Sequence, residues 1–488
     1  MPDDGPQASE SKPQPQAIPD EADPEASSSV PAGGRRRSRR SSRDLTKGSV
    51  RKNLWFLGWP QIAEGSLSVV DHFADLIWAG RLGFQAIAGL GVAQTYLMVT
   101  FMIRMGLDSA MRSMIARSIG AGQIPHANHV LLQAMTVTAV YAVLMIIAGQ
   151  VLTVPMLQVM GLSDAVIDQA DGYMRIQFMA MGILGLHRLT AGALQAAGDP
   201  ITPLKAASVT RITHLVLSPM LIFGWLGFPE MGLTGAAVAR LAAEWLGVAI
   251  NLRGLITGSS KLQLSLRGYY VDFPLIWRLI KLGAPASVTN MQRGISQLIV
   301  LSIVAPFGDG ALAAFALTRR TENLVTQGSR GLGRAAGTLA GQNLGANLPD
   351  RARSAVKWAV VYSGIASIFL AALVLAFPDP LVKLFNSDPE FVSQASRWVV
   401  IMAVGYLSVS LVQVFTQAFN TSGDTFGPMV VTLGSGWGVD IPLAFVLAKA
   451  TSLNEYGVAW ALVIGMTIRL LVFIWYYRRG RWLRTGMI

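Results

Sequence analysis

The sequence predicts an all-α integral membrane protein whose twelve transmembrane helices form two bundles of six. Composition gives the first reason, because 52% of the residues are hydrophobic and 14% are charged, whereas about a quarter of the residues in soluble domains are charged. The second reason is that apolar runs of about 20 residues, long enough to cross a bilayer, recur between residues 53 and 478. The third is a parallel internal repeat at one constant offset, which lays WP (59–60) on AP (284–285).

The chain begins with a stretch, residues 1–50, that we expect to be a disordered cytoplasmic tail. It is rich in Pro, Ser and acidic residues and has no core-forming pattern, which is typical of disorder. Its basic run RRRSRRSSR, at 35–43, is interpreted as a juxtamembrane anchor that contacts anionic lipids. Residues 481–488 are expected to form a second basic cytoplasmic tail.

Apolar runs separated by short polar, glycine or proline breaks predict the individual spans. The first six are expected at 53–79, 86–120, 127–152, 168–193, 201–224 and 232–256. The second six are expected at 276–305, 311–345, 352–377, 391–418, 426–449 and 455–478. They form an N-terminal bundle at 51–256 and a C-terminal bundle at 276–480, joined by a connector at 257–275.

The charged residues orient these spans. Lysine and arginine gather on one side of the expected membrane, in the segments Arg35–Lys52, Arg253–Lys281, Arg351–Lys357 and Arg478–Arg484. The loops on the other side are mainly acidic. By the positive-inside rule, both termini and the connector are expected to be cytoplasmic, in a protein of the plasma membrane.

The repeat is the most specific signal in the chain. The same offset of 225 residues, which we call the repeat shift, lays IGAG (119–122) on LGAN (344–347), and AGDPITP (197–203) on SGDTFGP (422–428). Because six spans is an even number, both halves have the same orientation and should be related by a twofold axis along the membrane normal. This arrangement is typical of transporters in which two bundles rock around a central cavity.

The first helix carries polar residues on one face. Glu64, Ser68, Asp71 and Asp75 are spaced four, three and four residues apart, which places them on one side of a helix. Ionisable groups at membrane depth avoid lipid and line cavities or helix contacts. Because a carboxylate in a low-dielectric site has its pKa raised, such a group can load and release a proton. The alternative is that these acids are neutralised in structural ion pairs.

Two features bear on that alternative. Arg104, Asp108 or Arg211 on neighbouring helices could supply the ion pairs. Pro60 lies four residues before Glu64 and removes a backbone hydrogen bond, so it is either a hinge for this helix or a static kink.

Other polar residues lie at similar depth in later helices. Arg211 and His214 are on the fifth, Asn290, Arg293 and Gln297 share one face of the seventh, and Asp440 precedes a proline in the eleventh. We assign Asp440 to cation coupling together with Glu64, Asp71 and Asp75. We assign to the substrate cavity Ser68, Arg211, His214, Ser218, Asn290, Arg293 and Gln297.

The composition also speaks against other functions. The chain has no cysteine, and its five histidines form no zinc motif, so no metal site is expected. The HANH run at 126–129 is interpreted as a solvated loop. An integral-membrane enzyme would need a nucleophile–base pair, and none is visible, so we expect neither catalytic residues nor a cofactor.

Several motifs resemble those of the multidrug and toxic compound extrusion (MATE) family, within the class of multidrug, oligosaccharide-lipid and polysaccharide exporters. These are DLIWAGRLG (75–83), AAGDPITP (196–203), LSPMLIFG (217–224), RTENL (320–324), GLGRAAGTLAGQNLGA (331–346) and IPLAFVLA (441–448). The resemblance covers about residues 50–480. It implies a cation-coupled antiporter that expels amphipathic, often cationic, compounds from the cytoplasm.

The resemblance carries over to some residues only. Asp75 matches the family's cation-binding aspartate on the first helix, and Glu322 matches its glutamate on the eighth. His214 and Ser218 stand where one branch has Asn and Asp, and Arg293 stands where another branch has a glutamate.

These departures bear on the ion and the substrate. A proton needs one tunable carboxylate, whereas sodium needs several oxygen ligands, so a proton is the expected coupling ion and sodium the alternative. An anionic or zwitterionic substrate, such as an organic acid or a lipid-linked sugar, is the alternative to an organic cation. The expected partners are this small molecule and membrane lipids, without nucleic acid, and the chain is expected to be a monomer.

Overall fold

The structure, a computed structural model, describes residues 43–82, 84–159, 164–258 and 260–483, and within these residues it contains helices and no strands. The first half forms α1 (Val50–Leu82), α2 (Phe84–Gly120), α3 (Ile124–Val159), α4 (Asp164–Ala196), α5 (Ile201–Phe223) and α6 (Gly232–Ile256). The second half forms α7 (Phe273–Val304), α8 (Asp309–Gly345), α9 (Pro349–Ala376), α10 (Pro378–Lys383), α11 (Pro389–Ser422), α12 (Phe426–Ser435), α13 (Ile441–Lys449) and α14 (Glu455–Arg479). With α12 and α13 counted as one interrupted span and the short α10 set aside, the predicted all-α fold of twelve long helices is confirmed.

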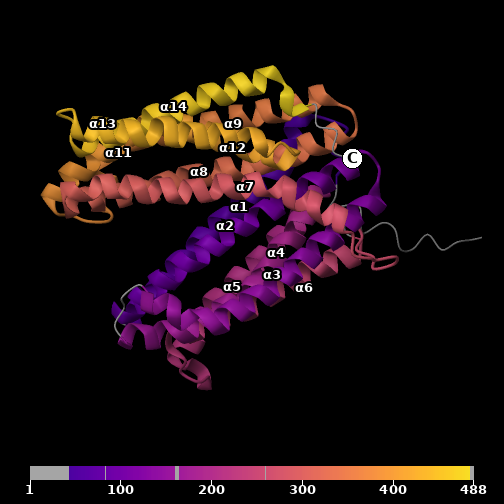
Figure 1. Ribbon diagram of the computed structural model, residues 1–488, viewed down its shortest axis with the longest axis horizontal. Coiled ribbons are helices and arrows are strands. Elements are labelled where there is room, and N and C mark those ends of the chain that lie inside the picture. The colour runs from indigo at the N-terminus through magenta and orange to yellow at the C-terminus, as the bar shows by residue number, and fades with distance from the viewer. Residues whose placement is uncertain (1–42, 83, 160–163, 259, 484–488) are drawn as a thin grey trace, which may run out of the picture. The chain divides into compact units, whose positions relative to one another are not determined.

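Eight of the described helical segments are long and apolar enough to cross a membrane. The remaining long helices, α1, α4, α7 and α8, have 32 to 37 residues, which is also sufficient length, but charged side chains interrupt them. In Figure 1, α3–α6 lie side by side with one another, as do α9–α14.

Two local features differ from the prediction. The helix α3 begins at Ile124, so the HANH run is part of its first two turns and not a loop. The eleventh span is interrupted by a π-helical turn, η4 (Gly436–Asp440), which directly precedes Pro442 at the start of α13. Proline cannot donate to the preceding turn, and π-helical turns occur frequently at functional sites.

The chain ends are described only in part. Residues 1–42 of the tail predicted at 1–50 lie outside the described residues, as do residues 484–488. The described end of that tail is packed against the helices, because Leu45 is fully buried and α1 begins at Val50. Within the predicted C-terminal tail, Arg481–Leu483 form the short turn η5, in which Trp482 is buried.

The repeated Gly–Asp motif has the same structural role in both halves. Gly198 and Gly423, after α4 and α11, both have positive φ angles, 89° and 107°, which glycine adopts without strain. The following aspartates then accept hydrogen bonds from the backbone of the next helix: Asp199 from the N–H of Ile201 and Thr202, and Asp424 from that of Gly427. In both halves the motif therefore ends one helix at the glycine and caps the start of the next helix with the aspartate.

The crossing of α2 and α8 shows the twofold relation between the halves. A Cβ atom on Gly120 would overlap the carbonyl oxygen of Gln342, and a Cβ on Gly345 would overlap that of Arg117. The repeat shift turns Gly120 into Gly345 and Arg117 into Gln342. The contact is therefore self-complementary, as a contact across a twofold axis must be.

The first helix also belongs to the packing of the second half. Leu54 and Leu57 of α1 are fully buried in a cluster with Leu332 and Leu339 of α8. Farther along, α1 packs against α5. A movement of α1 therefore changes the packing of both halves.

Candidate functional site

The polar face of α1 lies inside the protein. Asp71 and Asp75 retain 2% and 8% of their exposure, and Glu64 and Ser68 are half-buried. Pro60 is buried, and α1 runs through it as one helix. The side chain of Phe73, which the sequence places near Asp75, lies outside the described side chains.

The fifth and sixth helices supply the partners of the two aspartates. Arg211 donates to Asp71 Oδ2 at 2.8 Å, and His214 Nδ1 lies 2.6 Å from Asp71 Oδ1. The other ring nitrogen, His214 Nε2, lies 3.5 Å from Asp75 Oδ1. Arg240 of α6 is 3.4 Å from Asp75 Oδ2 and 3.9 Å from Asp71 Oδ2. One imidazole thus stands between two carboxylates, and two arginines flank them.

A second acid–histidine pair continues this cluster. His187 Nδ1 of α4 lies 2.5 Å from Glu244 Oε2 of α6, and Arg211 is 3.5 Å from the other oxygen of Glu244. The resulting network, which we call the first-half network, contains Asp71, Asp75, His187, Arg211, His214, Arg240 and Glu244. It draws on four helices.

Sequence reasoning omitted three of these residues. Arg240 and Glu244 are ionisable residues at i and i+4 on a membrane-length helix, a signal that could have found them. His187 is a lone histidine in α4, and nothing in the local sequence connects it to Glu244. Of the candidate ion-pair partners for the polar face of α1, Arg211 does bind Asp71, whereas Arg104 binds Asp108 at 3.2 Å.

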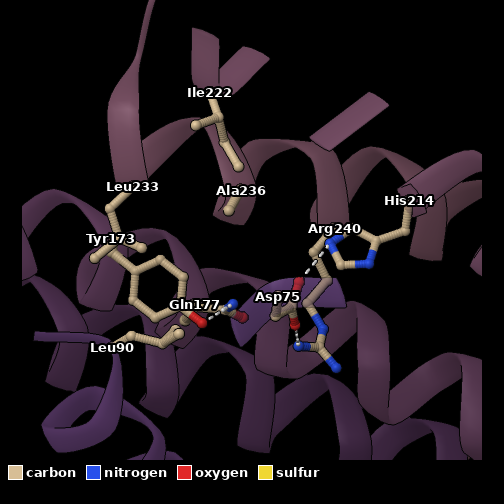
Figure 2. A pocket seen from close by; sticks show the side chains of 9 residues that line it. All are labelled: Asp75, Leu90, Tyr173, Gln177, His214, Ile222, Leu233, Ala236 and Arg240. Atoms are coloured by element: carbon tan, nitrogen blue, oxygen red, sulfur yellow. Dashed lines mark hydrogen bonds and ion pairs between the residues drawn. The ribbon is translucent and has the colours of Figure 1, made fainter. Parts of the chain in front are cut away.

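An enclosed cavity of about 10 Å³ adjoins Asp75, which is about the size of one water molecule. Figure 2 shows Asp75, Arg240 and His214 on one side of it and Tyr173 and Gln177 on the other, with apolar side chains completing the wall. Gln177 donates to the hydroxyl of Tyr173 at 2.9 Å. Asp75 therefore has polar space beside it, although it lies deep in the protein.

The cluster could also be considered as a cation site. Asp71, Asp75 and His214 each offer a ligand atom, and these atoms lie within 4.8 Å of one another. However, every carboxylate oxygen of the two aspartates already faces a nitrogen of Arg211, Arg240 or His214. The arginines supply the positive charge that a metal ion would otherwise bring.

The structure places the remaining predicted residues as follows. Ser218 lies 3.3 Å from His214 and so joins the first-half network. Glu64 is apart from it and accepts a hydrogen bond from Gln195 at 3.0 Å. Asn290 bonds to its own helix, and Gln297 is exposed.

The charged residues predicted in the second half form separate pairs. Glu322 binds Arg319 at 2.5 Å. Asp440, at the π-helical turn, forms a buried ion pair with Arg469 of α14. Arg293 donates to Gln413 at 3.1 Å.

Comparison with known proteins agrees with this architecture. The family model MatE matches residues 60–220 and 285–446. The second match begins at the position that the repeat shift assigns to residue 60. The internal repeat and the family match therefore divide the chain in the same way.

Individual transporters also resemble this chain over most of its length. The chain is 28% identical over 439 residues to the probable multidrug resistance protein YoeA of Bacillus subtilis, with 89% of this chain and 94% of that protein covered. It is 25% identical over 362 residues to a FAD transporter of Shewanella oneidensis, with 74% and 80% covered. A crystal structure of MATE in the bent conformation has a TM-score of 0.84 at 20% identity, with 90% of this chain and 97% of that chain covered.

The two matches to the family model together span more than half of the chain. Its repeated six-helix halves, its membrane-length helices and its similarity to multidrug resistance proteins all agree with that match. The chain therefore belongs to the MATE family, whose members are multi-pass membrane transporters and not enzymes.

Proposed function

We propose that the chain is a proton-coupled antiporter that exports amphipathic organic compounds from the cytoplasm by alternating access. The observation that carries this proposal is the buried pair Asp71 and Asp75 with His214 between them. Buried ionisable groups at membrane depth are costly, by about 2.5–3.5 kcal/mol each or more, and mark ion or substrate pathways.

Within this pair, Asp75 is the better proton acceptor. Asp71 is held by close contacts of 2.6 Å and 2.8 Å, whereas the contacts of Asp75 are 3.4 Å and 3.5 Å long. Only Asp75 lines the small cavity. A proton can therefore reach Asp75 without first breaking a short ion pair.

Protonation of Asp75 would weaken its attraction to Arg240 and so loosen α1 from α6. Since α1 also packs against α8, its movement would be transmitted to the second half, with Pro60 as the point of bending. Glu322 and Asp440 have arginine partners of their own and support this movement in the second half.

Sodium is the alternative coupling ion. Sodium would have to displace Arg211, Arg240 or His214 from the carboxylate oxygens, because these nitrogens already face all of them. Ser218 adds a single further oxygen. The donor set therefore favours a proton.

Transport in liposomes tests the coupling ion. Purified protein is reconstituted, and uptake of rhodamine 6G, a cation, and of fluorescein, an anion, is measured under a pH gradient or a sodium gradient. We expect the pH gradient to drive uptake of at least one dye and the sodium gradient alone to drive none. Equal uptake under sodium at constant pH would contradict proton coupling.

The proposed location is the plasma membrane, with both termini cytoplasmic and the protein acting as a monomer. Because the chain has no cysteine, single cysteines introduced into the connector can be labelled with an impermeant thiol reagent. Labelling should require permeabilised cells. Labelling at residues 260–270 in intact cells would show that the connector lies outside the cell and that the proposed orientation is wrong.

A second candidate keeps this mechanism and changes the cargo to an anionic or zwitterionic compound. The Shewanella relative is named a FAD transporter, and FAD carries a diphosphate. The arginines at membrane depth in this chain favour the same kind of cargo.

A further inference from the structure

Five arginines on α2, α4, α7 and α8 are close enough to interact electrostatically, each with the next, from the first half of the protein to the second. Arg188 of α4 interacts electrostatically with Arg112 of α2, and Arg112 with Arg334 of α8. Arg334 interacts with Arg330 one turn earlier on α8, and Arg330 with Arg293 of α7. We call these five residues the arginine row.

Three members of the row donate to the neutral side-chain amides of other residues. Arg112 donates to Gln195 Oε1 at 2.5 Å, and Arg293 donates to Gln413 Oε1 at 3.1 Å. Arg330 reaches Asn323 Oδ1 at 3.5 Å. The Nε atoms of Arg188 and Arg330 are buried and have no hydrogen-bond partner among the described residues.

The other arginines with acidic neighbours provide a comparison. Among the described residues, Arg104, Arg211, Arg240, Arg319 and Arg469 each have a carboxylate within ion-pair distance, and no member of the row has one. The acids near the row are Glu64, Asp108, Glu244 and Glu322. Asp108, Glu244 and Glu322 are already bound to arginines outside the row, so the row has a surplus of positive charge.

Such a row is unfavourable for the protein alone. Like charges repel, and positive charge at membrane depth without a partner is costly. The cost disappears when an anion enters. The planar guanidinium group suits this role because it binds carboxylates and phosphates through two parallel hydrogen bonds.

We propose that the arginine row binds the anionic group of the transported compound, so that the cargo is an amphipathic organic anion. This inference rests on the proposed function as a transporter. Arg188 lies over the ring of Phe101, 4.5 Å from its centroid, so an aromatic surface for the apolar part of the cargo adjoins the charge. Because the row joins α2 and α4 to α7 and α8, a bound anion holds both halves.

The row is also connected to the helix that carries Asp75. Gln195 accepts from Arg112 and donates to Glu64 Oε2. An anion that draws Arg112 away changes the environment of Glu64 on α1. Substrate binding in the row can thus change the contacts of α1, the helix that carries the proposed proton acceptor Asp75.

Binding of two dyes to the full chain in nanodiscs tests the charge of the cargo. Fluorescein and rhodamine 6G share a xanthene ring system but have opposite charge, and fluorescence anisotropy reports both. We expect fluorescein to bind at least tenfold more tightly. Arg112→Gln and Arg334→Gln should each weaken fluorescein binding at least tenfold, while Arg267→Gln, in the exposed connector, should not change it.

Two further measurements separate binding from folding. Because Arg334→Gln removes like-charge repulsion, the thermal midpoint without dye should stay the same or rise. Arg334→Lys keeps the charge and should retain more binding than Arg334→Gln. A loss of binding that follows a loss of folded protein, with no rescue by lysine, would give Arg334 a structural role and overturn the proposal.

The dyes also separate this proposal from the proposed function. Tight binding of fluorescein that the row variants weaken, without uptake under any gradient, would support the row and contradict the transport mechanism. Uptake of rhodamine 6G under a pH gradient, with no binding of fluorescein, would overturn the row and leave the antiporter in place.

Discussion

The two halves of the protein share their helices but not their charges. The repeat shift lays Asp71 on Ser296 and Asp75 on Val300, so α7 has no counterpart of the acids of α1. It also lays Arg240 on Gly465, which has no charge, and Glu244 on Arg469, which has the opposite charge. The first-half network is therefore a property of one half only.

The contacts that shape the fold behave in the opposite way. The glycine crossing of α2 and α8 and the Gly–Asp turns occur in both halves. Close packing of helices requires a small residue at a fixed position, whereas the fold does not require a charge at membrane depth. The difference indicates that the repeat preserves architecture and that the charges of the first half serve function.

The largest effect is expected from Asp75→Asn. The substitution keeps the size of the side chain and its hydrogen bonding but removes the titratable group. Uptake driven by a pH gradient should fall to the level of empty liposomes, while insertion and yield are unchanged because Arg240 keeps the carboxylate of Asp71 at 3.9 Å. If Asp75→Asn transported at near wild-type rate with unchanged pH dependence, the acid would be a structural partner of Arg240.

The pair Asp440–Arg469 tests whether the second half uses its charges differently. Asp440→Asn leaves Arg469 buried without its carboxylate partner, bonded to Ser435 and to the sulfur of Met466, which should cost about 3 kcal/mol of stability. The double variant Asp440→Leu/Arg469→Met should recover most of it, because apolar replacement of a buried ion pair is often neutral.

Thermal unfolding and transport together decide this point. The folded fraction of Asp440→Asn should keep the wild-type pH dependence of uptake. A change in that pH dependence, or a loss of uptake like the one expected for Asp75→Asn, would show that both halves carry the proton.

The glycine crossing should respond equally in the two halves. Gly120→Ala and Gly345→Ala each place a Cβ against a backbone carbonyl oxygen, and overpacking of this kind costs about 2 kcal/mol. The two variants are matched controls, because the repeat relates both the residues and the carbonyls that they meet. Unequal losses in thermal stability would show that the twofold relation is only approximate at this crossing.

Much of the fold could be predicted from the sequence because its signals are local. Hydrophobic length and the breaks between runs place the ends of α2, α5 and α6 close to where the structure has them. The interruption at Gly436–Asp440 was not predicted, since it depends on one extra residue in a helical turn. The HANH run was misassigned because Asn128 and His129 form their contacts with the connector, far away in the chain.

The site was harder to predict than the fold. Spacing alone placed Asp71 and Asp75 on one helix face, and the expectation of an ion pair with Arg211 matches the structure. The pairing of His187 with Glu244 joins residues 57 positions apart, and no periodicity reports such a contact. Which charged side chains face each other depends on how each helix is rotated about its own axis. The spacing of residues in the sequence does not give that rotation.

The smallest effect is expected in the connector, where the charge lies outside the helices. Asp272 caps α7 by accepting a hydrogen bond from the backbone N–H of Leu275 at 3.0 Å, and His129 of α3 lies 3.1 Å from its other oxygen. These two hydrogen bonds lower the pKa of Asp272 from its ordinary value of 3.8. The stabilisation is therefore present above about pH 4 and is lost only as the pH falls through the lowered pKa.

Asp272→Ala should accordingly cost about 1 kcal/mol, the usual loss for a helix N-cap, and a loss should be present throughout pH 5.5 to 8. Thermal unfolding across this range measures it, with Asp272→Asn as the control that retains a capping side chain. The pH dependence of transport should not change in either variant, because Asp272 stays ionised throughout. A shifted transport profile in Asp272→Ala would mean that the connector, and not the first-half network alone, takes part in proton coupling.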